Sequence, residues 1–214
     1  MRVALDLHDF SVVNNRMDLL LKLKEYYPLM KVSLFTVPFD VNREMNVEAR
    51  INRQGALDLI KKHLDWMQII PHGLSHMYRE MEKCDYQTFK DLVIPSIDEA
   101  LSKDGLPYEK GFKAPYWMWN EQVVKSLDEL GWWGATDRNN PTMPATKRVY
   151  TYTHSIRERF WESTNEVVNL HGHIDGESEN DLERCLVNLL KIPQEAEWKF
   201  VSDFVKDAQP GQRE

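Results

Sequence analysis

The sequence predicts an α/β fold built on a largely parallel sheet. Short apolar segments of strand character alternate with segments of helical periodicity through most of the chain. About seven strand segments in this length suit either a small, incomplete barrel or an open doubly wound sheet. The periodicity does not choose between them, but in both folds ligands bind at the carboxyl ends of the strands.

Seven segments are predicted as strands because they are short, apolar and rich in β-branched or aromatic residues. The clearest is KVSLFTV, and a segment near the C-terminus, Lys199–Phe204, is either one more strand or a docking segment. The seven are Arg2–Leu7, Lys31–Val37, Met67–Ile70, Gly111–Ala114, Trp132–Thr136, Arg148–Tyr152 and Glu166–Leu170.

Helices are predicted between the strands, where apolar residues recur every three to four positions. Asn14 or Asn15 can cap the first helix, Pro95 interrupts the third, and Gly131 ends the fourth. The predicted helices are Asn14–Tyr26, Val47–Leu64, Gln87–Leu101, Glu121–Leu130 and Asn180–Leu190.

Composition and charge indicate an ordinary globular protein. Apolar residues make up 42% of the 214 positions and charged residues 29%, and the net charge is −7. Without a basic run, this chain is a poor candidate for binding nucleic acid. No linker or repeat divides it, so we expect a single catalytic domain over residues 1–208 and a mobile polar tail over 209–214.

The ends of the chain and its two cysteines bear on location. The N-terminal MRVALDLHDF has no secretory apolar region and no small-residue cleavage site. No stretch approaches the roughly 18 apolar residues of a membrane span. Cys84 and Cys185 form no C-x-x-C motif and are expected to be reduced and buried. We therefore expect a complete, soluble, cytoplasmic protein of unknown oligomeric state that needs no membrane.

Titratable residues gather where predicted strands end. Five of the seven histidines lie in three such segments. The first strand ends in Asp6, His8 and Asp9, the third in His72 and His76, and the last in His171, His173 and Asp175. Because the carboxyl ends of parallel strands share one edge, we expect these groups to form one site.

The pair His72 and His76 suggests a metal site. Spacing of four residues places two imidazoles on one face of a helical turn, a geometry used for divalent metals. Asp9 supplies a third, oxygen ligand, which leaves coordination positions open for water and substrate. The alternative is that both histidines only cap and pack a loop; the neighbouring Asp9 and strand-end histidines favour the metal.

In their order along the chain, these segments resemble the motifs of the polysaccharide deacetylase family, also called the NodB-homology or carbohydrate esterase four family. Asp6–Asp9 stands where the family has Thr-Phe-Asp-Asp, and His72–His76 where it has His-Ser/Thr-x-x-His. Phe112–Tyr116 is similar to its Arg-x-Pro-Tyr/Gly motif, Asn169–His171 to its late Leu-His, and Ser33–Val37 to its second strand. The resemblance covers roughly residues 2 to 175.

The resemblance implies a distorted (β/α) barrel of about seven parallel strands. It also implies that Asp9, His72 and His76 hold a divalent metal, commonly zinc, and that His171 is the general acid at the leaving group. His8 stands where the family has a catalytic-base Asp. Either His8 is the base, or Asp6 substitutes for that Asp, or Asp6 orients His8 from the same face of the strand.

Other departures concern the substrate. Lys113 replaces the family's Arg, which turns a bidentate fork into a point charge, and Asp137 is the nearest candidate for the fourth motif. These departures indicate a divergent branch.

The candidate substrate-binding residues follow the fourth strand. They are Lys113, Pro115, Tyr116 and Trp117, joined by His173. Trp117 is the best placed to stack on a ring, and a backbone N–H near Tyr116 could contribute to an oxyanion site, although aromatic residues here are as often packing.

Three functions are therefore open. The first is a metal-dependent deacetylase acting on an N- or O-acetylated sugar. The second is a metal-dependent amidohydrolase of a small cyclic amide or a nucleotide-linked group. The third is a non-catalytic binding relative, ranked last because mere loss of function would not keep Asp9, His72, His76 and His171 together.

Overall fold

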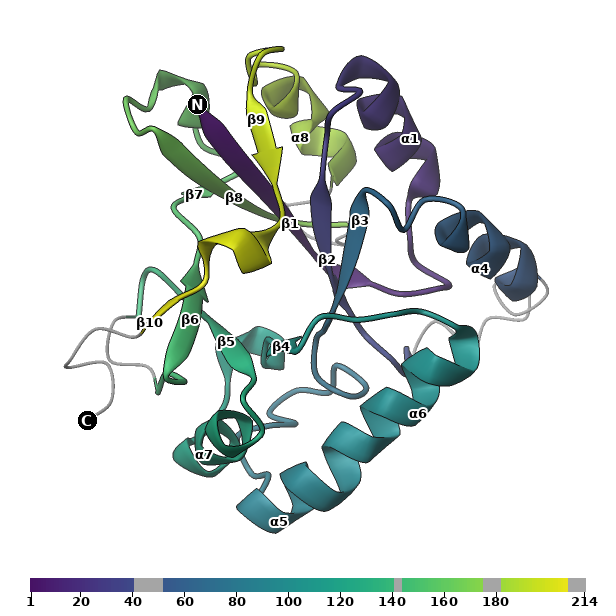
Figure 1. Cartoon of the computed structure of the whole chain (residues 1–214), viewed down its shortest axis with the longest axis vertical. Coiled ribbons are helices and arrows are strands. Elements are labelled where there is room, and N and C mark those ends of the chain that lie inside the picture. Colours follow the sequence, from purple (N-terminus) through teal and green to yellow (C-terminus); the bar gives the residue numbers. More distant parts are fainter. Residues whose placement is uncertain (41–51, 141–143, 175–181, 208–214) are drawn as a thin grey trace.

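Seven parallel strands carry the fold of this computed structural model, and helices lie around them (Figure 1). The structure describes residues 1–40, 52–140, 144–174 and 182–207. All seven strands coincide with segments predicted from the sequence. They are β1 (Arg2–Phe10), β2 (Val32–Thr36), β3 (Met67–Pro71), β4 (Gly111–Phe112), β5 (Trp133–Thr136), β6 (Arg148–Thr151) and β8 (Val167–His173).

The strands form two sheets that follow each other around a distorted barrel. One sheet has the order β3-β2-β1-β8 and the other β6-β5-β4, all in parallel pairs. Parallel bridges Ile69–Tyr108 and His72–Lys113 join β3 to the β4 segment. On the other side, the short strand β7 (His154–Ser155) pairs with β8. The predicted (β/α) barrel is thus confirmed, and the doubly wound alternative is not adopted.

Strand alternation divides the core into two layers. Along β1, Val3, Leu5 and Leu7 belong to the cluster under the helices, whereas Ala4 belongs to the cluster inside the barrel. That inner cluster consists of Ala4, Phe35, Ile70, Trp133, Ala135, Tyr150, Tyr152 and Val201. Asp6 and His8 share the inner face with Ala4, so the polar groups lie beyond an apolar floor.

Lys199–Phe204 was predicted to be either a strand or a docking segment, and it has features of both. The strand β9 (Glu197–Lys199) pairs with the first residues of β1, on the edge that β2 uses further along. A 3-10 helix, Val201–Phe204, then buries Val201 in the inner cluster, and β10 (Lys206–Asp207) pairs antiparallel with β6 (Figure 1). This segment therefore closes the amino-terminal end of the barrel.

The helices cover the outside of the sheet, and two of their predicted features were wrong. The first helix begins at Met17, not at Asn14, and Asn15 Oδ1 accepts a hydrogen bond from the Met17 N–H. Pro95 does not interrupt the third, because a π-helical turn, Phe89–Val93, precedes it and Pro95 lies in the first turn of the next helix. The helices are α1 (Met17–Tyr26), α4 (Arg53–Lys61), α5 (Tyr86–Thr88), α6 (Ile94–Asp104), α7 (Glu121–Glu129) and α8 (Leu182–Leu189).

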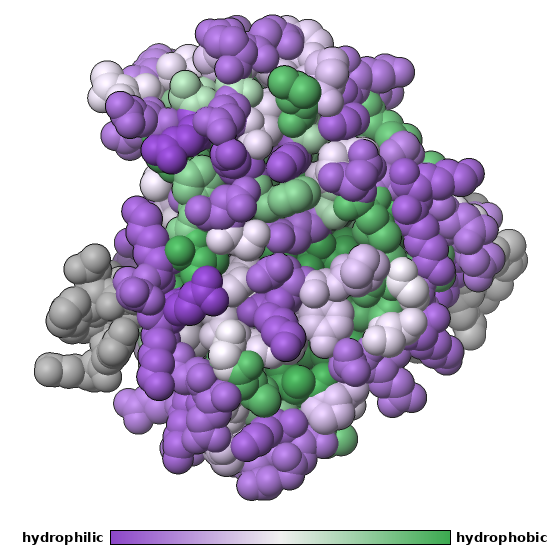
Figure 2. Space-filling model, viewed as in Figure 1, coloured by the Kyte–Doolittle hydropathy of each residue, from purple (hydrophilic) through white to green (hydrophobic). Residues whose placement is uncertain are grey.

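The surface and the two cysteines can be compared with the sequence predictions. The face in Figure 2 is mainly hydrophilic, with smaller apolar areas between the polar side chains. Among the described residues, no helix has the length and apolar character needed to cross a bilayer. Cys84 and Cys185 are buried thiols, as expected, and burial raises the pKa of Cys84 to about 11. The tail over 209–214 lies outside the described residues.

Two glycines give a matched test of packing. A Cβ at Gly111 would lie 2.2 Å from the buried Trp133 ring, so we expect Gly111→Ala to lower the free energy of unfolding by about 1–3 kcal/mol. Gly55 lies exposed in α4, and a Cβ there would meet nothing within 4 Å, so Gly55→Ala should raise it by roughly 0.5–1 kcal/mol. Urea denaturation of both variants measures the difference, and equal effects would contradict this packing.

Candidate metal and proton-transfer site

Asp9 reaches the site because the backbone leaves the regular strand there. Alternation from His8 would turn Asp9 away from the barrel interior. Instead the register of β1 against β2 shifts between Leu7 and Phe10, and Asp9 adopts a φ of 59°. Its Oδ1 then lies 3.2 Å from His72 Nε2 and 3.0 Å from His76 Nε2.

His72 and His76 come from a loop, not from the expected helical turn. His72 directly follows β3, and the chain turns at Gly73 and at His76, which have φ values of 65° and 58°. A Cβ at Gly73 would lie 2.4 Å from Pro115 Cγ, so the close approach of the two loops requires glycine. The spacing of four residues brings the rings together through these backbone turns.

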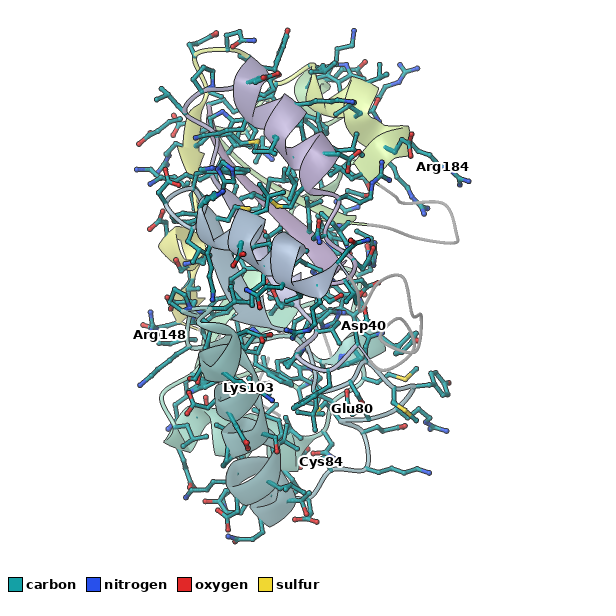
Figure 3. The ribbon with its side chains drawn as sticks, turned by 90° about the vertical axis from the view of Figure 1, so that its right-hand side faces the viewer. Asp40, Glu80, Cys84, Lys103, Arg148 and Arg184 are labelled. Atoms are coloured by element: carbon teal, nitrogen blue, oxygen red, sulfur yellow. The ribbon has the colours of Figure 1, made fainter. Side chains whose placement is uncertain are left out.

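Glu80 holds this loop in place, although no sequence motif singled it out. Its carboxylate accepts hydrogen bonds from the backbone N–H groups of Leu74 and Ser75 and from the Ser75 hydroxyl, at 3.2, 2.9 and 3.1 Å. Asp40, labelled with Glu80 in Figure 3, accepts a hydrogen bond from the Ser11 hydroxyl just after β1 at 2.7 Å. Carboxylates thus hold both the residue that follows β1 and the loop that carries His72 and His76.

The tautomer of His72 fits a bound cation. His72 Nδ1 lies 3.0 Å from the carbonyl oxygen of Lys113, which can only accept, so Nδ1 carries the hydrogen. Burial, followed by the charge of Lys113, lowers the pKa of His72 to about 3, and the ring is therefore neutral at pH 7. The lone pair of Nε2 then faces the Asp9 carboxylate.

Two acceptors that face each other in a buried place need a positive partner between them. Within the described part of the chain, neither His72 Nε2 nor Asp9 Oδ1 has a hydrogen-bond partner. Each such atom costs about 1–3 kcal/mol when left unpaired. With His76, they offer three ligand atoms that all lie within 4.8 Å of one another. Two imidazoles and one carboxylate are a donor set that suits zinc and related divalent metals.

A second group is centred on Asp6, which is 1% exposed. Tyr150 donates to Asp6 Oδ2 at 2.6 Å, and His171 Nδ1 donates to Oδ1 at 2.8 Å. His8 Nε2 lies 3.1 Å from the same Oδ1. Burial raises the pKa of Tyr150 well above its usual value, and the charge of Asp6 adds to this effect, so Tyr150 stays protonated and keeps donating.

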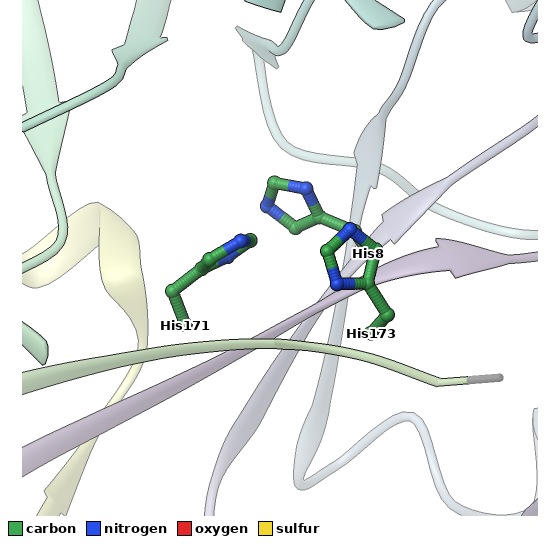
Figure 4. Close-up of side chains that lie close together, drawn as sticks. All are labelled: His8, His171 and His173. Atoms are coloured by element: carbon green, nitrogen blue, oxygen red, sulfur yellow. The ribbon is translucent and has the colours of Figure 1, made fainter. Parts of the chain in front are cut away.

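The register of β1 against β8 creates this group. Asp6 is paired with His171, and His8 with His173, so the four side chains meet on the inner face of two adjacent strands. Figure 4 shows His8, His171 and His173 close together. Burial lowers the pKa of His8 well below its usual value, and electrostatic effects of the neighbouring His171 and Lys113 act in the same direction.

The segment after β4 lines the other side. Tyr116 is 48% exposed, and its ring centroid lies 5.0 Å from that of His76. The Trp117 ring lies 5.5 Å from His8 and 5.7 Å from His171, and Lys113 Nζ is 4.2 Å from the centre of the Trp117 ring. Pro115 is buried against Gly73. Burial lowers the pKa of Lys113 to about 7.

The structure bears on the residues that the sequence left open. Both oxygens of Asp6 face donors from the protein, which is the environment of an orienting group. The carboxylate that contacts His171 is that of Asp6, whereas Asp137 accepts from the Tyr152 hydroxyl at 2.9 Å. Asp175 lies outside the described residues. No sequence motif singled out Tyr150. Its position on the predicted strand Arg148–Tyr152 was a signal that could have identified it.

We expect Tyr150→Phe to lower the free energy of unfolding by about 1–3 kcal/mol, because it leaves a buried carboxylate oxygen without its donor. Tyr108→Phe is the matched control, since its hydroxyl binds Asp98 at the surface and its loss should cost less. Chemical denaturation at pH 7 measures both. Equal losses would show that the bond between Tyr150 and Asp6 is not a stabilising one.

Comparison with known proteins relates this geometry to a known fold. No protein-family sequence model matches the chain, and no curated protein sequence matches it. Among solved structures, a deacetylase determined with its substrate matches with a TM-score of 0.60 at 14% identity, over 96% of this chain and 94% of that one.

Two further structures show the range within that fold. A family 4 acetyl xylan esterase from Clostridium thermocellum, with a cobalt ion, has a TM-score of 0.58 at 15% identity, over 95% of this chain and 89% of that one. A family 4 pseudoenzyme from Bacillus anthracis has a TM-score of 0.58 at 13% identity, over 94% and 64%. The resemblance read from the motifs is therefore confirmed in three dimensions: the chain has the fold of the carbohydrate esterase four, or polysaccharide deacetylase, family.

Proposed function

We propose that this protein is a divalent-metal-dependent hydrolase that removes acetyl groups from an N- or O-acetylated sugar. The observation that carries the proposal is a pair of facing acceptors, His72 Nε2 and Asp9 Oδ1, which lie beside His8 and His171 and have no hydrogen-bond partner among the described residues. The fold similarity to deacetylases and esterases supports the reaction class.

Asp9, His72 and His76 would hold the ion, and zinc is the first candidate because two imidazoles and one carboxylate suit it. The ion would polarise the acyl carbonyl and make water a stronger acid at neutral pH. The site reaches solvent at Asp9 and His76, whose side chains are 22% and 23% exposed. A substrate can therefore approach the ion from that side.

His8 is the proposed base. Its Nε2 faces the Asp6 carboxylate and so carries the hydrogen, which leaves the lone pair on Nδ1. Nδ1 is buried and has no hydrogen-bond partner among the described residues. As the oxygen of water bonds to the acyl carbon, Nδ1 would accept the proton of that water.

His171 is the proposed acid, and Asp6 its positioning residue. The hydrogen bond from Nδ1 to Asp6 turns Nε2 away from the carboxylate. A proton on Nε2 would pass to the nitrogen or oxygen of the sugar as its bond to the acyl carbon breaks, and acetate and the free amine or alcohol leave. Two imidazoles on one carboxylate thus divide the roles of base and acid.

The exposed aromatic residues support a sugar substrate. The Tyr116 ring lies next to that of His76. The ring of Tyr78, which is 64% exposed, has its centroid 5.5 Å from the centroid of the Tyr116 ring. Sugar rings pack well on such faces because their C–H groups are apolar. Lys113, Trp117 and His173 would contact the substrate deeper in the site. Pro115 would hold the segment after β4 in position.

His8 in place of a carboxylate, and a pseudoenzyme among the proteins of similar fold, favour a second candidate function, a non-catalytic sugar-binding protein. A cyclic amide or nucleotide-linked substrate remains as an alternative for an active enzyme. Assays for acetate release from acetylated oligosaccharides and for ammonia or carboxylate release from cyclic amides distinguish these three.

We expect Asp9→Ala and His72→Ala to abolish acetate release and the tightest metal binding together, because each removes one of three ligands. His63→Ala is the control, since His63 contacts Trp66 away from the site. Elemental analysis and an acetate assay on EDTA-treated, zinc-reconstituted protein measure both properties. Full activity in the metal-free wild type would contradict the proposal.

We expect His8→Gln and His171→Gln each to lower kcat by about 10²- to 10⁴-fold, the usual contribution of a general base or acid. KM should change much less, because neither ring is the main binding surface. His154→Gln, at a histidine that contacts Thr153, should keep kcat. Steady-state kinetics on one acetylated oligosaccharide provides the comparison, and wild-type kcat in His8→Gln would leave Asp6 or another group as the base.

A further inference from the structure

Three histidines form a second group of metal-competent side chains beside the first. His8, His171 and His173 each offer one ring nitrogen, and these atoms lie within 4.8 Å of one another. None of the three belongs to the Asp9–His72–His76 set. Figure 4 shows the three rings facing a common space, with His8 on β1 and the other two on β8.

The barrel fixes these rings in place. His8 and His173 are paired across β1 and β8, and His171 lies one inward position before His173. Between the two β8 histidines, Gly172 faces outward, where a Cβ would lie 2.3 Å from Ile156 Cδ1. Ile156 therefore packs closely against the outer face of the strand at this position.

In the neutral forms of these rings, lone pairs and not N–H groups point toward the common space. Asp6 Oδ1 accepts the hydrogen bond of His171 Nδ1 and lies 3.1 Å from His8 Nε2, so the lone pairs of neutral His171 and His8 are on Nε2 and Nδ1 respectively. Among the described residues, the buried atoms His8 Nδ1 and His173 Nδ1 have no hydrogen-bond partner. Converging lone pairs without a donor are what a cation stabilises.

We propose that His8, His171 and His173 bind a second divalent cation next to the Asp9–His72–His76 site. Asp6 would act as the outer carboxylate that orients two of the three ligands and increases their basicity, an arrangement common around metal-bound histidines. Three imidazoles leave a fourth tetrahedral position open and suit zinc. The His8 and His72 ring centroids are 5.1 Å apart, so the two ions would be close neighbours.

The local charges bear on affinity. Asp6 and Asp9 supply two negative charges to the region. Lys113 opposes a second cation, because its side chain is buried in the same site and acts electrostatically on both His8 and His173. We therefore expect the second ion to bind more weakly than the first, since only the first has a carboxylate ligand.

Occupation of the second site would have a consequence for the reaction, and this consequence alone rests on the proposed function. The second ion would take His8 Nδ1 and His171 Nε2, the atoms proposed to move protons. Zinc in excess of one equivalent should then inhibit acetate release. Binding of the ion is independent of whether the protein is a deacetylase.

The test is the stoichiometry of zinc and cobalt on EDTA-treated full-length protein. Isothermal titration with Zn²⁺, and Co²⁺ absorption spectra in the visible region, should show two sites in the wild type. His173→Ala should keep the tighter site and weaken the other by at least tenfold. Asp9→Ala should weaken the tighter site and keep the second one. His154→Ala should keep both zinc sites.

Several outcomes decide the proposal. A wild type that saturates at one equivalent, or a His173→Ala variant that still binds two with unchanged affinity, would overturn it. If His173→Ala does not fold by circular dichroism, His173→Gln and His171→Gln replace it, because both keep the side-chain volume nearly unchanged. Two bound ions with no acetate release from any sugar would support the second site and reject the proposed function.

Discussion

The buried carboxylate of Asp6 is the constraint on which the rest of the site depends. A charge with 1% exposure is stable only when donors surround it, and Tyr150, His171 and His8 do so from three strands. Because each donor is held by this single group, the carboxylate determines which nitrogen of each ring stays free. The chemistry of the site thus follows from one residue that need not touch a substrate.

The arrangement of Asp9, His72 and His76 depends instead on irregular backbone conformation. A register shift in β1 and positive φ values at Asp9, Gly73 and His76 turn three candidate ligands toward one point. Such conformations cost free energy and persist where the surroundings determine them. Here Glu80 and the contact between Gly73 and Pro115 provide that support. Regular strands place the residues proposed to transfer protons, and distorted segments place the proposed metal ligands.

The similarity to solved structures extends over nearly the whole chain at 13–15% identity, so it concerns the fold. Proteins of this fold include both esterases and a pseudoenzyme, and activity must therefore be argued from the residues. In this chain, His8 occupies the place of a carboxylate, and Asp6 contacts His171. A carboxylate in the strand interior, two residues earlier, thus supports both imidazoles.

The sequence alone determined the seven barrel strands and singled out candidate residues at their ends, because buried parallel strands are short apolar runs and polar residues at their ends stand out against them. It did not determine how His72 and His76 meet, that Pro95 is accommodated by a π-helical turn, or that Asp6 contacts His171 and Tyr150. Those features depend on register between strands about 140 to 165 residues apart and on backbone turns set by tertiary contacts. Local periodicity carries no information on either, and so only the folded structure decided them.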